Sequence, residues 1–269
     1  MLKFLSSIFL SLAVMTTTIP AQELIPDAPA TEQEAMIGIS NFAAINGALY
    51  LSLNYTVPEN FRLALMADSI ISYTYPLVET CHNNPDFQAR YEETFIKLAK
   101  LINSNKQKLI KAGIRFHGLS IDLSMQALKS MLPDEYKELI PGDELDLSEP
   151  EEALSQPEML VANYLCYVGG SSFIKLVDLL ETMLANKVDR NEINRQVLDI
   201  VKDDWRIAAQ YQLVLDPTLK TLTLADHETN SMFIECMTQT WNSIPEYAKK
   251  DILSDPLLKT WLEKWQERL

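Results

Sequence analysis

The stretch that decides the fold is Pro157–Leu184, which reads PEMLVANYLCYVGGSSFIKLVDLLETML. From Met159 to Ile174 it holds 16 residues without a charged side chain, and its apolar residues are spread over all sides of a helix. A helix that is apolar all round is either a membrane span or the centre of a soluble core. This uncharged run is shorter than the roughly 20 residues that cross a bilayer. We therefore expect a buried central helix over 157–184.

The remaining patterns predict an all-α protein. The 269 residues include only 7 glycines but 13 prolines, which favours long helices joined by short, proline-marked turns. Apolar residues recur at helical spacing over 85–112 and again over 191–215. We expect about nine helices, packed as an irregular bundle around the central helix, in a helical domain over 31–269.

Proline, glycine and short polar residues mark the expected helix ends. Pro76 is expected to kink or end its helix, because proline lacks the backbone N–H of a helix interior. Gly113 is expected to stop the helix before it. Asn191 is expected to cap one later helix, and Asp255-Pro256 to open the last one.

The amino terminus has the three-part pattern of a secretory signal peptide. Lys3 precedes the 12-residue apolar run FLSSIFLSLAVM over 4–15, and TTTIPA follows. We expect cleavage after Ala21, so that 1–21 is a cleaved signal peptide and 22–30 a flexible leader. The apolar run is too short to span a bilayer. The protein is therefore expected to be periplasmic or secreted, without a stable membrane span after cleavage.

An acidic segment, 134–158, interrupts the helical pattern. It contains ten acidic residues and a single base, Lys137. Proline and glycine break it further, which is typical of a connection between packed units. We expect an acidic linker over 133–156 that joins two possible sub-bundles, 31–132 and 157–269.

The net charge limits the classes of partner. There are 37 acidic and 23 basic residues, a net charge of −14. Nucleic acids and anionic membranes both bind basic surfaces, so neither is expected as a partner. A basic protein is the expected partner if there is one, because opposite charge speeds its encounter. The candidate contact residues are Asp143, Glu144, Asp146 and Glu149. A solvated linker without any partner is the alternative interpretation.

Three cysteines bear on the exported state. Export to an oxidising compartment permits a disulfide, and Cys166 lies in the apolar central helix, where a buried thiol is expected. Cys81 and Cys236 are therefore the candidate pair. The other pairings, and the absence of any bridge, remain open alternatives.

Motifs for catalysis, metals and cofactors are absent from the sequence. His82, His117 and His227 lie far apart, so no metal site is expected. Gly113–Gly118 has the glycine spacing of a phosphate-binding loop, but Leu119 stands where the lysine is needed. No catalytic residue and no cofactor is assigned.

Together these features predict an exported, soluble helical protein with a binding or protective role. One concrete form is an inhibitor or immunity-type protein for a cationic toxin or enzyme. The alternative is a helical periplasmic enzyme or small-ligand carrier with a pocket between helices. That pocket would use Asn163, Tyr164 and Ser171 of the central helix. The oligomeric state is left open.

Overall fold

A computed structural model describes residues 46–47, 49, 58–82, 85–147, 172–185, 189–215 and 237–266. Throughout these ranges the chain is helical or irregular and no β-strand occurs, which confirms the all-α prediction. None of the helices within them is long and apolar enough to cross a membrane. The elements are α4 (Glu59–His82), α5 (Pro85–Ala112), α6 (Leu119–Ser130), the 3-10 helix η1 (Asp134–Leu139), helical residues 172–185, α8 (Arg190–Leu215), helical residues 237–243, α10 (Glu246–Ser254) and α11 (Pro256–Gln266).

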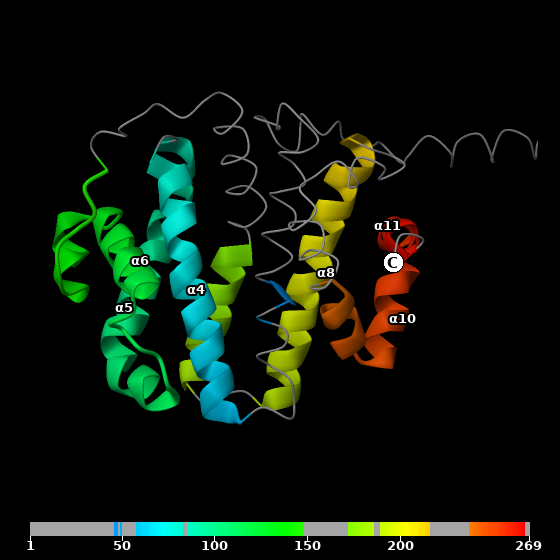
Figure 1. The fold of residues 1–269 in the computed structure, drawn as a ribbon, viewed down its shortest axis with the longest axis horizontal. Helices are drawn as coiled ribbons and strands as arrows, with labels where there is room; N and C mark the ends of the chain where they lie inside the picture. Colours follow the sequence, from blue (N-terminus) through cyan, green and yellow to red (C-terminus); the bar gives the residue numbers. More distant parts are fainter. Residues whose placement is uncertain are drawn as a thin grey trace, which may run out of the picture.

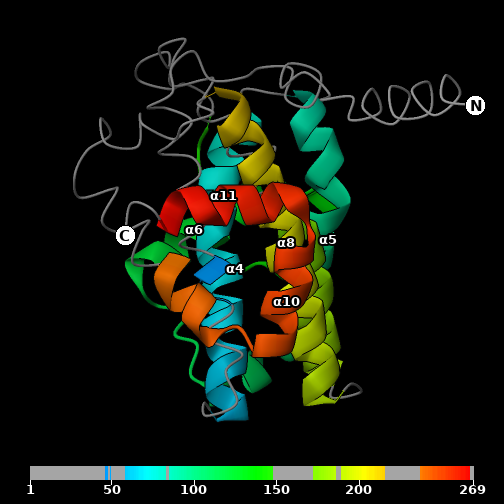
Figure 2. The same cartoon turned by 90° about the vertical axis from the view of Figure 1, so that its right-hand side faces the viewer.

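The helices form an irregular bundle that is extended in one direction. In Figure 1, α5, α6 and η1 lie at one end, α4 and α8 stand nearer the middle, and α10 and α11 lie at the other end. α5 runs antiparallel to α4, as a short connection requires. α11 lies across the direction of α8 and contacts it (Figure 2). The predicted bundle is thus confirmed.

Helix 172–185, the described part of the predicted central helix, is buried in the core. Phe173 is 1% exposed, and its ring centre lies 5.9 Å from that of Phe95 in α5 and 6.3 Å from that of Tyr73 in α4. On another side, Lys175 bonds Asp203 of α8 at 2.6 Å. The helix therefore connects the α4–α5 end of the molecule to α8. The rest of the predicted central helix, 157–171, lies outside the described residues.

α4 does not end at Pro76 but continues to His82. A proline inside a helix leaves the carbonyl four residues earlier without its usual N–H donor. Here that carbonyl belongs to Ser72, and the buried hydroxyl of Ser124 in α6 donates to it at 3.4 Å. A neighbouring helix thus supplies the donor that the proline lacks.

The other predicted helix ends are confirmed with one exception. Gly113 ends α5 with φ of 119°, and the Asp255 carboxylate accepts the Leu257 N–H at the start of α11 (2.9 Å). The prediction that Asn191 caps α8 is wrong. The Asp189 carboxylate does so, accepting the N–H of Asn191 at 2.5 Å, because Asp189 directly precedes the first helical residue.

Residues 133–147 of the predicted acidic linker pack against α5 and α6. Ile140 is 1% exposed, and the Leu145 N–H donates to the Gln126 carbonyl at 3.2 Å. The Lys100 ammonium lies 4.6 Å from the centre of the Tyr136 ring. This part of the segment is therefore attached to the bundle, while 148–156 lies outside the described residues. The division into two sub-bundles stays a prediction.

Candidate functional site

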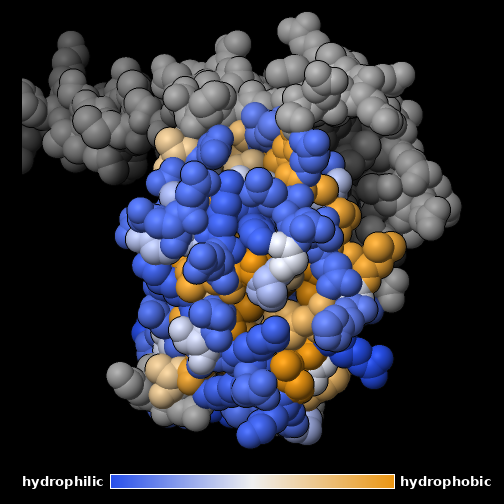
Figure 3. All heavy atoms as spheres, turned by 90° about the vertical axis from the view of Figure 1, so that its left-hand side faces the viewer, coloured by the Kyte–Doolittle hydropathy of each residue, from blue (hydrophilic) through white to orange (hydrophobic). Residues whose placement is uncertain are grey.

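A groove with a volume of about 650 Å³ lies between α5, α6 and the segment around η1. These elements belong to the face that is turned to the viewer in Figure 3, where hydrophobic side chains show between hydrophilic ones. Its apolar lining comes from Ile102, Phe116, Met125 and Leu139. Its ionisable lining comes from Asp122, Glu138, Asp143, Lys106 and His117.

Two glycine turns place these side chains around one hollow. At Gly113 the chain leaves α5 with a positive φ, and its N–H bonds back to the Leu109 carbonyl at 3.1 Å. α6 then packs against α4, which brings Asp122 to the groove that α5 also lines. A second positive φ, 100° at Gly142, turns the chain after η1, and Lys129 of α6 donates to the Gly142 carbonyl. This bond holds Asp143 near α6.

The groove has an excess of negative charge that its own residues do not neutralise. Within the described part of the chain, neither Asp122, Glu138 nor Asp143 forms an ion pair. Against these three carboxylates, Lys106 is the single lysine or arginine among the residues that line the groove. The groove can therefore accept positive charge from outside.

The four predicted contact residues have different fates. Asp143 lines the groove. Glu144 instead bonds Lys137 at 2.9 Å, and this bond, together with Asp134, raises the pKa of Lys137. Asp146 is exposed, and Glu149 lies outside the described residues.

The other predicted site residues are mostly beyond the described ranges. Cys81 is buried in α4, whereas its proposed partner Cys236 is not described, so their disulfide stays a prediction. The predicted pocket residues Asn163, Tyr164 and Ser171 also lie outside the described residues.

Sequence reasoning missed the groove. In the sequence, Glu138 is only one of the ten acidic residues over 134–158, and Asp122 belongs to no motif. Nothing local marks either residue, because they come to one groove only when α6 packs on α4 and η1 packs on α5. The one available signal was the pair of glycines, Gly113 and Gly142, at chain reversals that bracket α6 and η1.

A second polar cluster lies inside the bundle, around Asp204 of α8. This carboxyl is 0% exposed and accepts hydrogen bonds from the Ser172 hydroxyl and the Asn46 side chain. Burial raises the pKa of Asp204 to about 8, against the opposing effects of Ser172, Lys175 and Asn46. At neutral pH this group is therefore mostly protonated.

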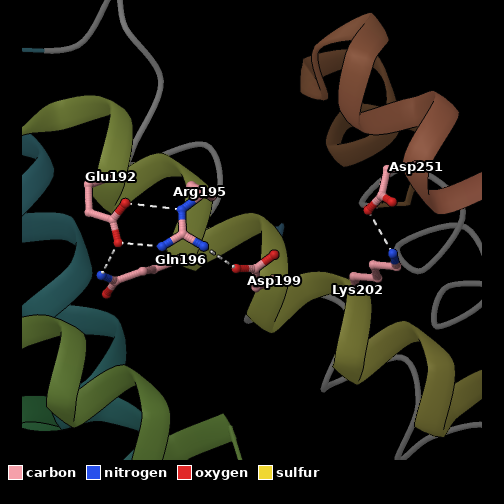
Figure 4. A network of polar contacts seen from close by, with 6 residues as sticks. All are labelled: Glu192, Arg195, Gln196, Asp199, Lys202 and Asp251. Carbon is pink, nitrogen blue, oxygen red and sulfur yellow. Dashed lines mark hydrogen bonds and ion pairs between the residues drawn. The ribbon is translucent and has the colours of Figure 1, made fainter.

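The exposed side of α8 carries a third set of polar contacts (Figure 4). Arg195 bonds Glu192 at 2.5 Å and Asp199 at 3.2 Å, and Lys202 bonds Asp251 of α10 at 2.6 Å. Pairs of this exposure contribute about 0–1 kcal/mol each. Their charges are mutually satisfied, so this surface offers less to a partner than the groove does.

No protein-family profile, curated protein or solved structure matches this chain.

No group of three or more histidine, cysteine or carboxylate side chains within the described ranges could hold a metal ion. The groove combines unpaired carboxylates with an apolar lining, an arrangement suited to binding an amphipathic cation.

Proposed function

We propose that this protein is exported and binds a basic partner protein by accepting a lysine- or arginine-bearing segment of it in the groove. The observation that carries the proposal is the set of three carboxylates, Asp122, Glu138 and Asp143, that share one groove without an ion-pair partner in the described chain. A single exposed carboxylate would mean little, since most acidic side chains face water.

The apolar lining explains why lysine or arginine fits better than a simple cation. Both side chains bury a methylene stem against apolar surface while their charged head remains near water or a carboxylate. Phe116, Met125 and Leu139 provide such a surface beside the carboxylates. An arginine head can also form paired bonds with one carboxylate, which adds geometric specificity.

A protective role follows from the charge and the expected location. Removing 1–21 takes away Lys3, the only charged residue in that segment, and leaves a net charge of −15 in place of −14. Such a chain attracts cationic proteins over distances of about a Debye length. An inhibitor or immunity-type protein for a cationic toxin or enzyme would use this attraction for rapid capture and the groove for selectivity.

The test compares two triple variants with equal charge. Asp122→Asn, Glu138→Gln and Asp143→Asn neutralise the groove, whereas Glu92→Gln, Glu93→Gln and Glu263→Gln neutralise three exposed carboxylates elsewhere. Binding of fluorescent oligolysine and oligoarginine peptides is followed by anisotropy, with an oligoglutamate peptide as the negative probe. We expect the groove variant to lose about tenfold or more in affinity, and the matched variant about twofold or less.

An equal loss in both variants would show that the peptides respond to overall charge, and would contradict the proposed groove. Native mass spectrometry of the protein from its own host then identifies the partner. A heavier, salt-labile complex with a basic protein is the expected result.

A small-ligand carrier is the second candidate function, and the groove volume favours it. About 650 Å³ falls within the range of about 300–1,000 Å³ that is typical of small-molecule sites. A small cationic adduct that survives salt in the same mass spectrum would support this function over a protein partner.

A further inference from the structure

Asp204 lies where α8 meets helix 172–185 and Asn46. The Ser172 hydroxyl, at the start of the described part of that helix, donates to Oδ1 of Asp204. The other oxygen, Oδ2, is buried and has no hydrogen-bond partner among the described residues. A carboxylate normally needs several donors to be stable away from water. This site is therefore built for a carboxyl group that is not fully charged.

The charged neighbours of Asp204 do little to stabilise its ionised form. Lys175, from helix 172–185, is the cation that acts on it, but its ammonium bonds Asp203 at 2.6 Å. Asp203, the preceding residue of α8, adds repulsion. The pairs that tie α8 to α10 and to Asp255, Lys202–Asp251 and Arg206–Asp255, are already satisfied. The two groups that donate to Asp204 within the described ranges, Ser172 and Asn46, are uncharged.

We propose that Asp204 is a proton-dependent joint, which holds α8 against helix 172–185 while its carboxyl is protonated and loosens this contact when the carboxyl ionises. The joint is independent of the groove. An exported protein is exposed to the pH of its surroundings. At alkaline pH such a joint would loosen α8 and the helices packed on it.

The sign of the effect follows from the direction of the pKa shift. The pKa of Asp204 rises from 3.8 to about 8 on folding, chiefly by burial. The native state therefore holds one proton more than the unfolded state between these two values. The stabilisation is fully present below the unfolded pKa and declines as the pH rises to about 8, by up to tenfold in the folding constant per pH unit.

The chain carries its own reporter for this joint. Its 4 tryptophans are Trp205, Trp241, Trp261 and Trp265, all on α8 or later in the sequence. Trp205 directly follows Asp204, and its ring centre lies 6.1 Å from that of Trp261 and 6.5 Å from that of Trp241. Loosening of α8 would change the surroundings of this cluster and hence its fluorescence.

The experiment titrates the full chain and two variants, Asp204→Asn and Asp203→Asn, from about pH 6 to about pH 9. Tryptophan emission and urea unfolding are measured at each pH. We expect the unaltered chain to show an emission change with a midpoint near pH 8, and Asp204→Asn to show none. Asp203→Asn should keep the change but move its midpoint to lower pH, because the repulsive neighbour is gone and Lys175 is released.

An unaltered chain without a transition, or an Asp204→Asn variant with the same transition, would overturn the proposal. Carboxyl-carbon NMR of the unaltered chain gives a second test that needs no variant. One aspartate that titrates above about pH 7 is expected, whereas titration of every aspartate below about pH 6 would sink the idea.

Discussion

Phe173 joins helix 172–185 to both helices of the α4–α5 pair. Its ring packs against both Tyr73 and Phe95 and is almost fully buried. Truncation would remove its burial and leave a cavity between three helices. We expect Phe173→Ala to lower the free energy of unfolding by about 3–5 kcal/mol, measured by urea denaturation.

Lys97 provides the matched control, because it joins α5 to helix 172–185 by charge rather than by packing. It bonds Asp178 at 2.6 Å and Glu181 at 2.7 Å, and both carboxylates are more than half exposed. Lys97→Met should therefore cost only about 0–1 kcal/mol. If it cost as much as Phe173→Ala, the assignment of this contact to packing would be wrong.

Gly113 has a backbone conformation that few other residues adopt, with φ of 119°. An added Cβ would meet only the Ala64 Cβ at 3.8 Å, an ordinary contact, so the cost of substitution is backbone strain and not a clash. We expect Gly113→Ala to destabilise the protein by about 1–3 kcal/mol.

Gly118 caps α6 from an extended conformation with open space around it. Gly118→Ser should instead stabilise the protein by a few tenths of a kcal/mol, because the serine hydroxyl can accept a hydrogen bond from a free N–H in the first turn of α6. Thermal unfolding of the Gly113→Ala and Gly118→Ser variants measures both changes in stability. If both variants were destabilised, or both stabilised, this explanation would be contradicted.

The individual helices were predictable where their signals are local. α5 has the bounds expected from its apolar periodicity, and α11 starts at the expected Asp255-Pro256 pair. Whether α4 would end at Pro76 or continue was left open by the sequence, because the compensating donor, Ser124, is 48 positions later and reaches this turn only after α6 has packed.

The groove was beyond sequence reasoning for the same physical reason. The acidic composition predicted a solvated linker over 133–156. This segment also contains a few apolar residues, which are outnumbered by its carboxylates. Tyr136, Ile140 and Leu145 attach this segment to α5 and α6. Composition averages over a segment, whereas attachment depends on a few buried side chains and on which surface they meet.

The distribution of charge over the molecule supports a binding role more than the net value does. Many basic side chains form ion pairs with carboxylates of the same chain. They are Lys97, Lys137, Lys175, Arg195, Lys202, Arg206 and Lys249. Within the described residues, the groove carboxylates Asp122, Glu138 and Asp143 take no part in such pairs. Their field acts on approaching molecules and not on the fold.

The proposed function also requires export, which the sequence of 1–21 predicts and which can be tested on the intact chain. We expect protein recovered outside the cytoplasm to begin at Gln22 and to weigh less than the 30.6 kDa of the 269-residue chain by the mass of 1–21. A charge in the apolar run should block this processing, because that run must enter an apolar environment during export. Leu10→Asp should therefore leave the full-length chain inside the cell, whereas a conservative Leu10→Ile should be processed normally. Intact-mass measurement of both cell fractions distinguishes these outcomes. A full-length chain in every fraction would remove export from the proposed function. The peptide-binding test of the groove would still be valid, because Asp122, Glu138 and Asp143 all lie far from the processed segment in sequence.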